Sequence, residues 1–147
     1  MKPKVRETPS AYREGQEPGP RFLTQGDVVL LHTDVITRLG GKPGVIDAGS
    51  LAMAVKQPRR RVLGQLVHST LIEQAGAYVF HLITARPFHD GNKRTGLFSA
   101  FFFLHDNGAT VIGDSDAWQD LTTAVAAGQL TLPALTAKLA HFVRYGE

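Results

Sequence analysis

Residues 87–95 read Pro87-Phe88-His89-Asp90-Gly91-Asn92-Lys93-Arg94-Thr95, and this polar stretch lies between two apolar segments. It follows one long apolar segment and begins another, which extends to residue 104. It brings a carboxylate, a glycine, an amide and two cations into five consecutive positions. Such a turn at the start of a helix favours anion binding, because glycine lets backbone N–H groups approach an anion and the helix dipole is positive there. The sequence therefore predicts a phosphate site in a loop between two central helices.

A plainer interpretation of the same stretch needs no ligand. Asp90 would cap the second helix, Gly91 would make a turn, and Lys93 and Arg94 would be solvated charges. Cations in the first turn have the wrong sign for the helix dipole, which weakens this interpretation. The residue types alone leave both interpretations open.

Together with Arg86, the stretch resembles the signature of the Fic/Doc superfamily, His-x-Phe-x-Asp/Glu-Gly/Ala-Asn-Gly/Lys-Arg. Lys93 stands where the death-on-curing (Doc) branch of that superfamily has lysine in place of the second glycine. Two other segments, residues 39–54 and 104–108, are also similar to the family. The resemblance covers roughly residues 22–145.

The resemblance implies ATP and Mg²⁺ as cofactors. It implies that Asp90 coordinates Mg²⁺ and that Gly91, Asn92, Lys93 and Arg94 hold the phosphates. Fic proteins mostly transfer an adenylyl group to a hydroxyl of a target protein, whereas Doc proteins transfer the γ-phosphate to a threonine of elongation factor Tu and halt translation. Lys93 favours the Doc reaction, because a lysine fills space that glycine leaves for the nucleotide in adenylyl transferases. On this resemblance Asp90, Lys93 and Arg94 are candidate catalytic residues.

Arg86 departs from the signature, because it stands where the family carries its catalytic histidine. An arginine side chain cannot act as a base near pH 7, since its pKa lies above about 12. His89 occupies a variable position, and we interpret it as an exposed loop histidine. Three explanations for an arginine at this position remain open. The chain is an inactivated variant of a toxin, or it is a natural protein without full activity, or its chemistry is altered so that Arg86 stabilises transition-state charge.

Three functions follow from these alternatives. The first is a Doc-like toxin that phosphorylates elongation factor Tu and is weakened or inactive because of Arg86. The others are a Fic-type protein adenylyltransferase and a non-catalytic homologue that binds an antitoxin or a nucleotide. The resemblance also implies a Phd-like antitoxin partner whose C-terminal segment folds into a groove near the active site.

Composition limits the remaining possibilities. The chain has 147 residues, is 43% apolar and contains no cysteine, which suits one compact domain without disulfides or thiolate metal sites. No apolar run approaches the roughly 18 residues of a membrane span, and we expect a soluble, cytoplasmic protein. The net charge of +3 is modest, and no aromatic residues are interleaved with the basic cluster Arg59-Arg60-Arg61. Direct nucleic-acid binding is therefore not expected.

The predicted fold class is all-α, a compact bundle of five to six helices over residues 22–147. Residues 1–21 contain four prolines and many charges, and predict a disordered N-terminal arm. Thr24 begins a helix that runs from about residue 25 to 39, where Gly40 stops it. The next segment, residues 41–50, fits a loop that the resemblance makes a flap bordering the active site. A short helix over 50–56 follows.

Apolar periodicity predicts the rest of the bundle. Residues 62–84 read as one long helix, and residues 97–104 are apolar nearly all round, which indicates burial on most faces. Residues 109–112 fit a short extended piece, Asp114 or Ser115 caps a further helix, and Thr131 caps the last.

Two side chains are expected in the core near the predicted phosphate loop. His32 lies near an apolar stripe, and we interpret it as a core histidine rather than a ligand. Phe88 should fill the core beneath the loop, while Pro87 fixes the backbone so that the anion site is preorganised.

Overall fold

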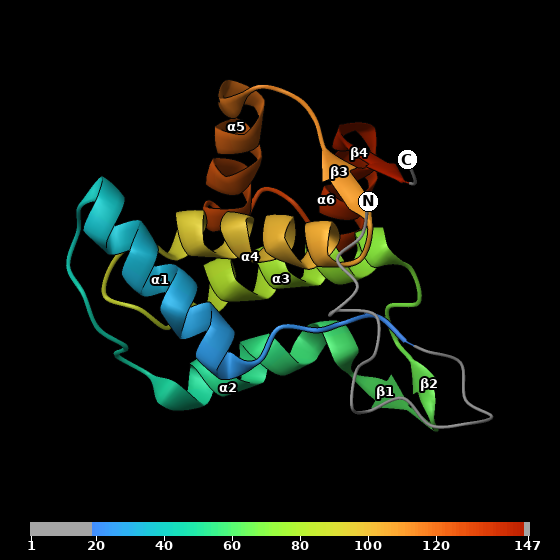
Figure 1. Cartoon of the computed structure of the whole chain (residues 1–147), viewed down its shortest axis with the longest axis horizontal. Coiled ribbons are helices and arrows are strands. Elements are labelled where there is room, and N and C mark those ends of the chain that lie inside the picture. Colours follow the sequence, from blue (N-terminus) through green and yellow to red (C-terminus); the bar gives the residue numbers. More distant parts are fainter. Residues whose placement is uncertain (1–18, 146–147) are drawn as a thin grey trace.

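The computed structural model describes residues 19–145, which form a bundle of six α-helices with two short 3₁₀ turns and two small two-stranded sheets (Figure 1). The elements are α1 (Gln25–Leu39), α2 (Ala48–Lys56), η2 (Gln57–Arg59), β1 (Arg61–Val62), β2 (Gln65–Leu66), α3 (Leu71–Ala85), α4 (Asn92–Asp106), β3 (Ala109–Val111), α5 (Ser115–Ala126), α6 (Leu132–Leu139), η3 (Ala140–Phe142) and β4 (Val143–Tyr145). The all-α prediction is confirmed. Most of the predicted arm, residues 1–18, lies outside the described residues.

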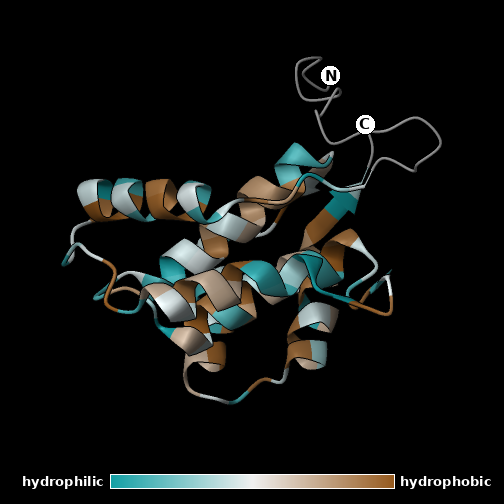
Figure 2. Ribbon diagram, turned by 90° about the horizontal axis from the view of Figure 1, so that it is seen from below, coloured by the Kyte–Doolittle hydropathy of each residue, from teal (hydrophilic) through white to brown (hydrophobic). Residues whose placement is uncertain are grey.

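Helices α3 and α4 lie side by side at the centre of the bundle, and the other helices pack around this pair (Figure 1). The two helices approach closely because Gly96 of α4 has no side chain, and a Cβ built there would be 3.2 Å from Ile83 Cγ1. Hydrophobic and hydrophilic residues are interleaved along the helices, as expected for helices with one buried face (Figure 2). The largest fully buried side chains include Tyr78, Leu82 and Phe103.

Helix α1 matches its prediction. It spans Gln25–Leu39, and its capping box is complete, because Thr24 accepts from the N–H of Asp27 while the Asp27 carboxylate accepts from the N–H of Thr24. The predicted extended piece is strand β3, and Asp114 and Thr131 are the N-caps of α5 and α6. Helix α2 begins two residues before the prediction, since Asp47 accepts from the backbone N–H of Ser50 as its N-cap.

The prediction of one helix over residues 62–84 was wrong for residues 62–70. Helix α3 begins only at Leu71, and a β-hairpin precedes it, in which Arg61 pairs with Leu66 and Val62 with Gln65. The apolar spacing of Val62 and Leu66 fits a helix turn, but the residues between them form the turn of the hairpin. The basic cluster Arg59-Arg60-Arg61 is exposed and spans the end of η2 and the start of β1.

Burial along α4 matches the prediction for residues 97–104 with one exception. Phe103 and Leu104 are buried, as expected, but Phe102 is 51% exposed. Helices α1, α3 and α5 and strand β3 all pack against α4. Among the described residues, no helix has both the length and the apolar content needed to cross a membrane.

Both ends of the described chain are tied to the carboxyl end of α4. The side chain of Asn107 accepts from the backbone N–H of Arg21 at 2.8 Å and donates to its carbonyl at 3.0 Å. At the other end, Tyr145 of β4 pairs with Ala109 of β3, directly after α4. The N-terminal segment is held further by the hydroxyl of Tyr78, which accepts from the N–H of Leu23 at 2.8 Å.

Candidate active site

The predicted phosphate loop, residues 86–91, connects α3 to α4 and is anchored by Phe88. The Phe88 side chain is 1% exposed, so its predicted place in the core is confirmed. Its ring stacks on the imidazole of His32, with the ring centroids 3.8 Å apart and the planes at 6°. The conformation of the loop is therefore set by one buried side chain as well as by the two helices that it joins.

Asn92 holds the same loop from the other side. Its side-chain Oδ1 accepts from the Phe88 N–H at 3.1 Å, and its Nδ2 donates to the Phe88 carbonyl at 3.0 Å. We expected this amide to donate to phosphate, but the geometry directs it back onto the loop. Only one hydrogen of Nδ2 and the backbone N–H of Asn92 are left for a ligand.

The first turn of α4 is open. Its N-cap is Gly91, with φ of 77°, and no side chain caps the helix. The Thr95 N–H reaches the Gly91 carbonyl at 2.9 Å, whereas the N–H groups of residues 92–94 precede the first intrahelical acceptor. The side chains of Lys93 and Arg94 are exposed beside these groups. Backbone donors, helix dipole and two cations thus meet at one point, which suits an anion.

Asp90 does not cap α4, so the plainer interpretation of this residue was wrong. Its carboxylate accepts from two backbone N–H groups, that of Gly91 at 3.1 Å and that of Lys42 at 3.2 Å. The side chain is exposed, and no group of three or more His, Asp or Glu side chains gathers within residues 19–145. A single carboxylate suits Mg²⁺, which commonly keeps water ligands and takes its other oxygens from substrate phosphates.

The segment between α1 and α2 lies against the loop, as the predicted flap should. Val45 forms an isolated antiparallel bridge with Phe88, and the His89 N–H donates to the Gly44 carbonyl at 3.1 Å. A Cβ at Gly41 would lie 3.1 Å from Asp90 Oδ2 and 2.9 Å from Ile36 Cδ1. The absence of a side chain at residue 41 therefore lets the segment approach the carboxylate.

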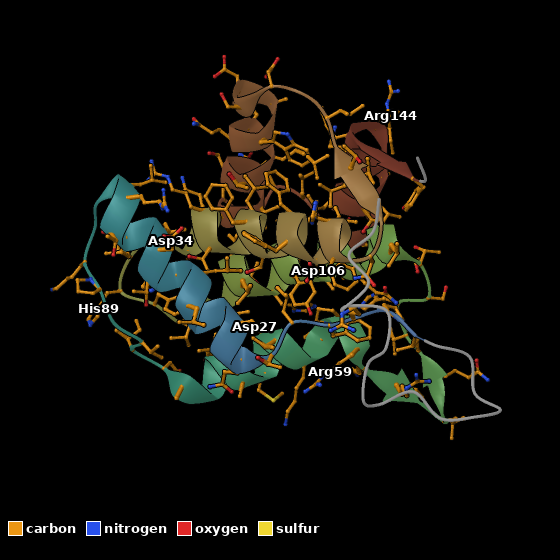
Figure 3. All side chains as sticks on the ribbon, in the orientation of Figure 1. Asp27, Asp34, Arg59, His89, Asp106 and Arg144 are labelled. Carbon is orange, nitrogen blue, oxygen red and sulfur yellow. The ribbon has the colours of Figure 1, made fainter. Side chains whose placement is uncertain are left out.

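Arg86 ends α3 in a left-handed conformation, with φ of 49° and ψ of 55°. Such a conformation costs a non-glycine residue about 1–2 kcal/mol, and histidine, asparagine and aspartate adopt it more readily than most. The guanidinium is exposed and has no hydrogen-bond or ion-pair partner within the described part of the chain. His89 is exposed as predicted, and lies at the outer edge of the molecule (Figure 3).

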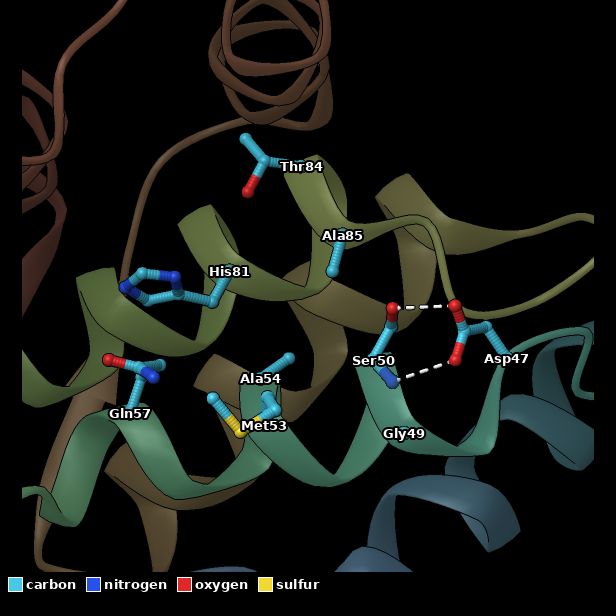
Figure 4. Close-up of a pocket in the computed structure, with 9 residues that line it drawn as sticks. All are labelled: Asp47, Gly49, Ser50, Met53, Ala54, Gln57, His81, Thr84 and Ala85. Carbon is cyan, nitrogen blue, oxygen red and sulfur yellow. Dashed lines mark hydrogen bonds between the residues drawn. The ribbon is translucent and has the colours of Figure 1, made fainter.

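A groove of about 420 Å³ runs between α2 and α3 and ends beside the loop (Figure 4). At that end the Asp47 carboxylate accepts from the hydroxyl and the N–H of Ser50, and these hydrogen bonds lower the pKa of Asp47. The Asp47 N–H in turn donates to the Pro87 carbonyl at 3.3 Å. His81 lies at the other end, where burial first and then the nearby charges of His68 and Arg60 lower its pKa.

The structure thus brings the predicted residues Asp90 to Arg94 together with Arg86 around one loop. Sequence reasoning missed two contacts with this loop, from the imidazole of His32 and the backbone N–H of Lys42. No local pattern could reveal them, because His32 lies 58 residues before its partner and Lys42 lies 48 residues before its own.

Comparison with known proteins gives a consistent result. The model of the Fic/DOC family matches residues 22–104. The chain is 32% identical over 115 residues to the protein kinase doc of Escherichia phage P1. This alignment covers 78% of this chain and 90% of that protein. It is also 36% identical over 115 residues to the toxin Doc of Mycolicibacterium smegmatis. That alignment covers 74% of this chain and 88% of the toxin. Because the family match includes the whole loop and more than half of the chain, the protein belongs to the Fic/DOC family, in the branch of the Doc toxins.

Proposed function

We propose that this protein is a Doc-type toxin kinase, weakened by Arg86, that transfers the γ-phosphate of ATP to a hydroxyl of a translation factor, with elongation factor Tu as the candidate target. The observation that carries the proposal is the open first turn of α4 beside the Asp90 carboxylate and the side chains of Lys93 and Arg94. The name of the phage relative, protein kinase doc, supports phosphoryl transfer as the reaction.

The residues of the loop fit a magnesium–nucleotide complex. Asp90 would hold Mg²⁺, which would neutralise charge on the phosphates when it is bound. Backbone N–H groups of residues 92–94 and the cations Lys93 and Arg94 would hold the phosphate oxygens. These contacts position the phosphate chain, and the remaining requirement is removal of the proton from the acceptor hydroxyl.

Arg86 cannot remove that proton, because a guanidinium group has only N–H donors and no acceptor for a proton. We infer that this position carries the base in active members of the family, and that its exchange for arginine lowers turnover. Loss of a general base typically costs about 10²- to 10⁴-fold in rate. The binding part of the site would remain, so that the chain still takes up the nucleotide.

We also propose an antitoxin partner of the Phd type. The name of the mycobacterial relative, toxin Doc, supports a protein whose activity must be held in check by its host. The Arg86 side chain and the groove beside the loop are both exposed, so a bound antitoxin segment would have access to the site.

The decisive experiment compares this chain with its Arg86→His variant. Each is incubated with elongation factor Tu and ATP that carries label at either the α- or the γ-phosphate. We expect γ-label on the target with Arg86→His, at a rate about 10²- to 10⁴-fold above that of the parent. Arg86→Gln is the matched control, since it removes the charge without supplying a base, and should stay at the parent rate. Coexpression with the neighbouring reading frame should yield a complex that suppresses the label.

Each contrary result has a distinct meaning. Label from α-ATP would replace the kinase by an adenylyltransferase. Equal transfer by the Arg86→Gln and Arg86→His variants would contradict the role of a base at this position. Absence of label with both nucleotides would refute elongation factor Tu as the target, and nucleotide binding by the same samples would then favour a non-catalytic homologue. Recovery of the toxin without any partner would refute the antitoxin proposal.

A further inference from the structure

We propose that His32 is a positioning residue that fixes the orientation of the peptide between Asp90 and Gly91, and with it the carboxylate of Asp90. The inference about loop geometry stands on the contacts of His32 alone. Its catalytic consequence rests on the proposed function, because that function gives the Asp90 carboxylate its task.

The hydrogen bond from His32 is directed at the backbone of the loop. The imidazole comes from α1, is 3% exposed, and places Nε2 at 2.8 Å from the Asp90 carbonyl oxygen. A carbonyl oxygen only accepts, so Nε2 must carry a hydrogen and donate it. The contact therefore selects the tautomer of His32 protonated at Nε2, or its charged form.

Packing against neighbouring groups holds the imidazole ring in place. One face stacks on the ring of Phe88, with the planes at 6°. The ring is also close to the backbone that follows Asp90, since a Cβ built on Gly91 would lie 3.7 Å from His32 Cδ2. The side chain thus has a fixed position from which Nε2 can define the place of one carbonyl oxygen.

Fixing this carbonyl fixes the whole peptide. In a trans peptide the C=O and N–H groups point in opposite directions. With the carbonyl held by His32, the N–H of Gly91 points away from α1 and donates to Asp90 Oδ1 at 3.1 Å. A flip of this peptide would break both hydrogen bonds. It would also set a carbonyl oxygen against the carboxylate, on the side where the phosphates are expected.

The carboxylate of Asp90 is then held between two parts of the chain. Oδ1 accepts from Gly91 and Oδ2 accepts from the N–H of Lys42 in the flap at 3.2 Å. His32 thereby links α1, the phosphate loop and the flap through one peptide. When His32 is changed, the Asp90 carbonyl loses this donor, and the direct effect falls on the orientation of the peptide between Asp90 and Gly91.

Two substitutions separate the hydrogen bond of His32 from its packing. His32→Phe keeps an aromatic ring against Phe88 and removes the donor. His32→Gln keeps an amide nitrogen near the place of Nε2 and removes the ring. His105→Phe, at an exposed position near the end of α4, is the matched control for the same change.

Transfer of γ-label is measured in the Arg86→His background. We expect His32→Phe to lower transfer by about 10- to 100-fold, as is usual when a supporting hydrogen bond of a site is lost, mainly in kcat. His32→Gln should recover most of this loss although it packs less well. Full transfer by His32→Phe, with loss in His32→Gln, would show that packing alone matters, and would overturn the proposal. Equal losses in the two variants would also overturn it, because the amide donor would then have restored nothing.

A second measurement does not depend on the reaction. The ¹⁵N spectrum of the full-length protein should show His32 protonated at Nε2, and the order parameter of the Gly91 N–H should fall from about 0.85 to below about 0.6 in His32→Phe but not in His32→Gln. If the Arg86→His parent transfers no label, the proposed function fails and these spectra still decide the role of His32. An unprotonated Nε2, or a Gly91 N–H that stays rigid in His32→Phe, would overturn it.

Discussion

Phe88 shows how a single residue can set both stability and the shape of a site. Its ring is buried against His32, while Asn92 binds its backbone N–H and carbonyl. The side chain anchors the loop to the core, and the backbone contacts hold the following turn in register with α4. Stability and site geometry are therefore coupled at this position.

We predict that Phe88→Ala lowers the free energy of unfolding by about 3–5 kcal/mol, because it removes a fully buried ring and leaves a cavity. Urea unfolding at pH 7 measures this change. Phe102→Ala is the control, since that ring is half exposed on α4 and its loss should cost much less. Equal destabilisation by the two variants would mean that Phe88 is not an anchor.

The residues of the site differ in how readily the sequence reveals them. Asp90 to Arg94 could be predicted because they are consecutive and lie at the start of an apolar helix. The burial of Phe88 followed from its type and its place in the loop. The turn of the Asn92 amide toward Phe88, and the contact of His32 with Asp90, depend on atoms in three dimensions and left no periodic signal.

At the level of helices and strands, the bounds of an element were predicted correctly where the sequence carries a signal at both of its ends. Helix α1 was predicted with its observed bounds because a capping box starts it and Gly40 ends it. Helix α3 also has a capping box, made by Thr70 and Glu73, and this pair marks the true start that the apolar stripe obscured. Caps therefore deserve more weight than periodicity where the two disagree.

The hairpin before α3 was missed because its turn residues are unusual. Leu63 and Gly64 have φ of 53° and 80°, as in a type I′ turn, which most often contains Asn-Gly. Leu63 is also 96% exposed, so it gains nothing from burial. The turn bears both backbone strain and an exposed apolar side chain.

Leu63→Asn should therefore stabilise the protein by roughly 1 kcal/mol, because asparagine tolerates the left-handed conformation better than leucine. Thermal unfolding measures this as a rise in Tm. Val62→Asn, in the adjacent strand, is the matched control and should not stabilise, since no positive φ is relieved there. A Tm that is unchanged or lowered by Leu63→Asn would contradict the strain at this turn.

At the scale of the whole molecule, we expect two histidines to make stability depend on pH. Burial lowers the pKa of His68 and of His81, Arg60 adds to both effects, and Glu73 opposes the change at His68. Below a pH of about 6.5 the unfolded chain takes up protons at these positions more readily than the folded chain. The contribution of these histidines to stability is present above that pH and is lost as the pH falls through their lowered pKa values.

We expect urea midpoints to decrease between pH 7.5 and pH 5, and His81→Gln to reduce the size of this decrease. The substituted amide cannot take up the proton that burial disfavours. His105→Gln, exposed at the end of α4, serves as the comparison. An identical pH dependence in the parent and in His81→Gln would assign the acid sensitivity to other groups.

The convergence of both ends of the described residues, 19–145, on residues 107–109 has a practical consequence for handling the protein. The phosphate loop lies at the opposite end of α4, which has 15 residues and is therefore about 22 Å long. An affinity tag or a fluorescent protein that replaces residues 1–18 or residues 146–147 thus starts far from the loop. A reporter or a surface tether at either of these two points should leave the loop open to nucleotide, target and antitoxin.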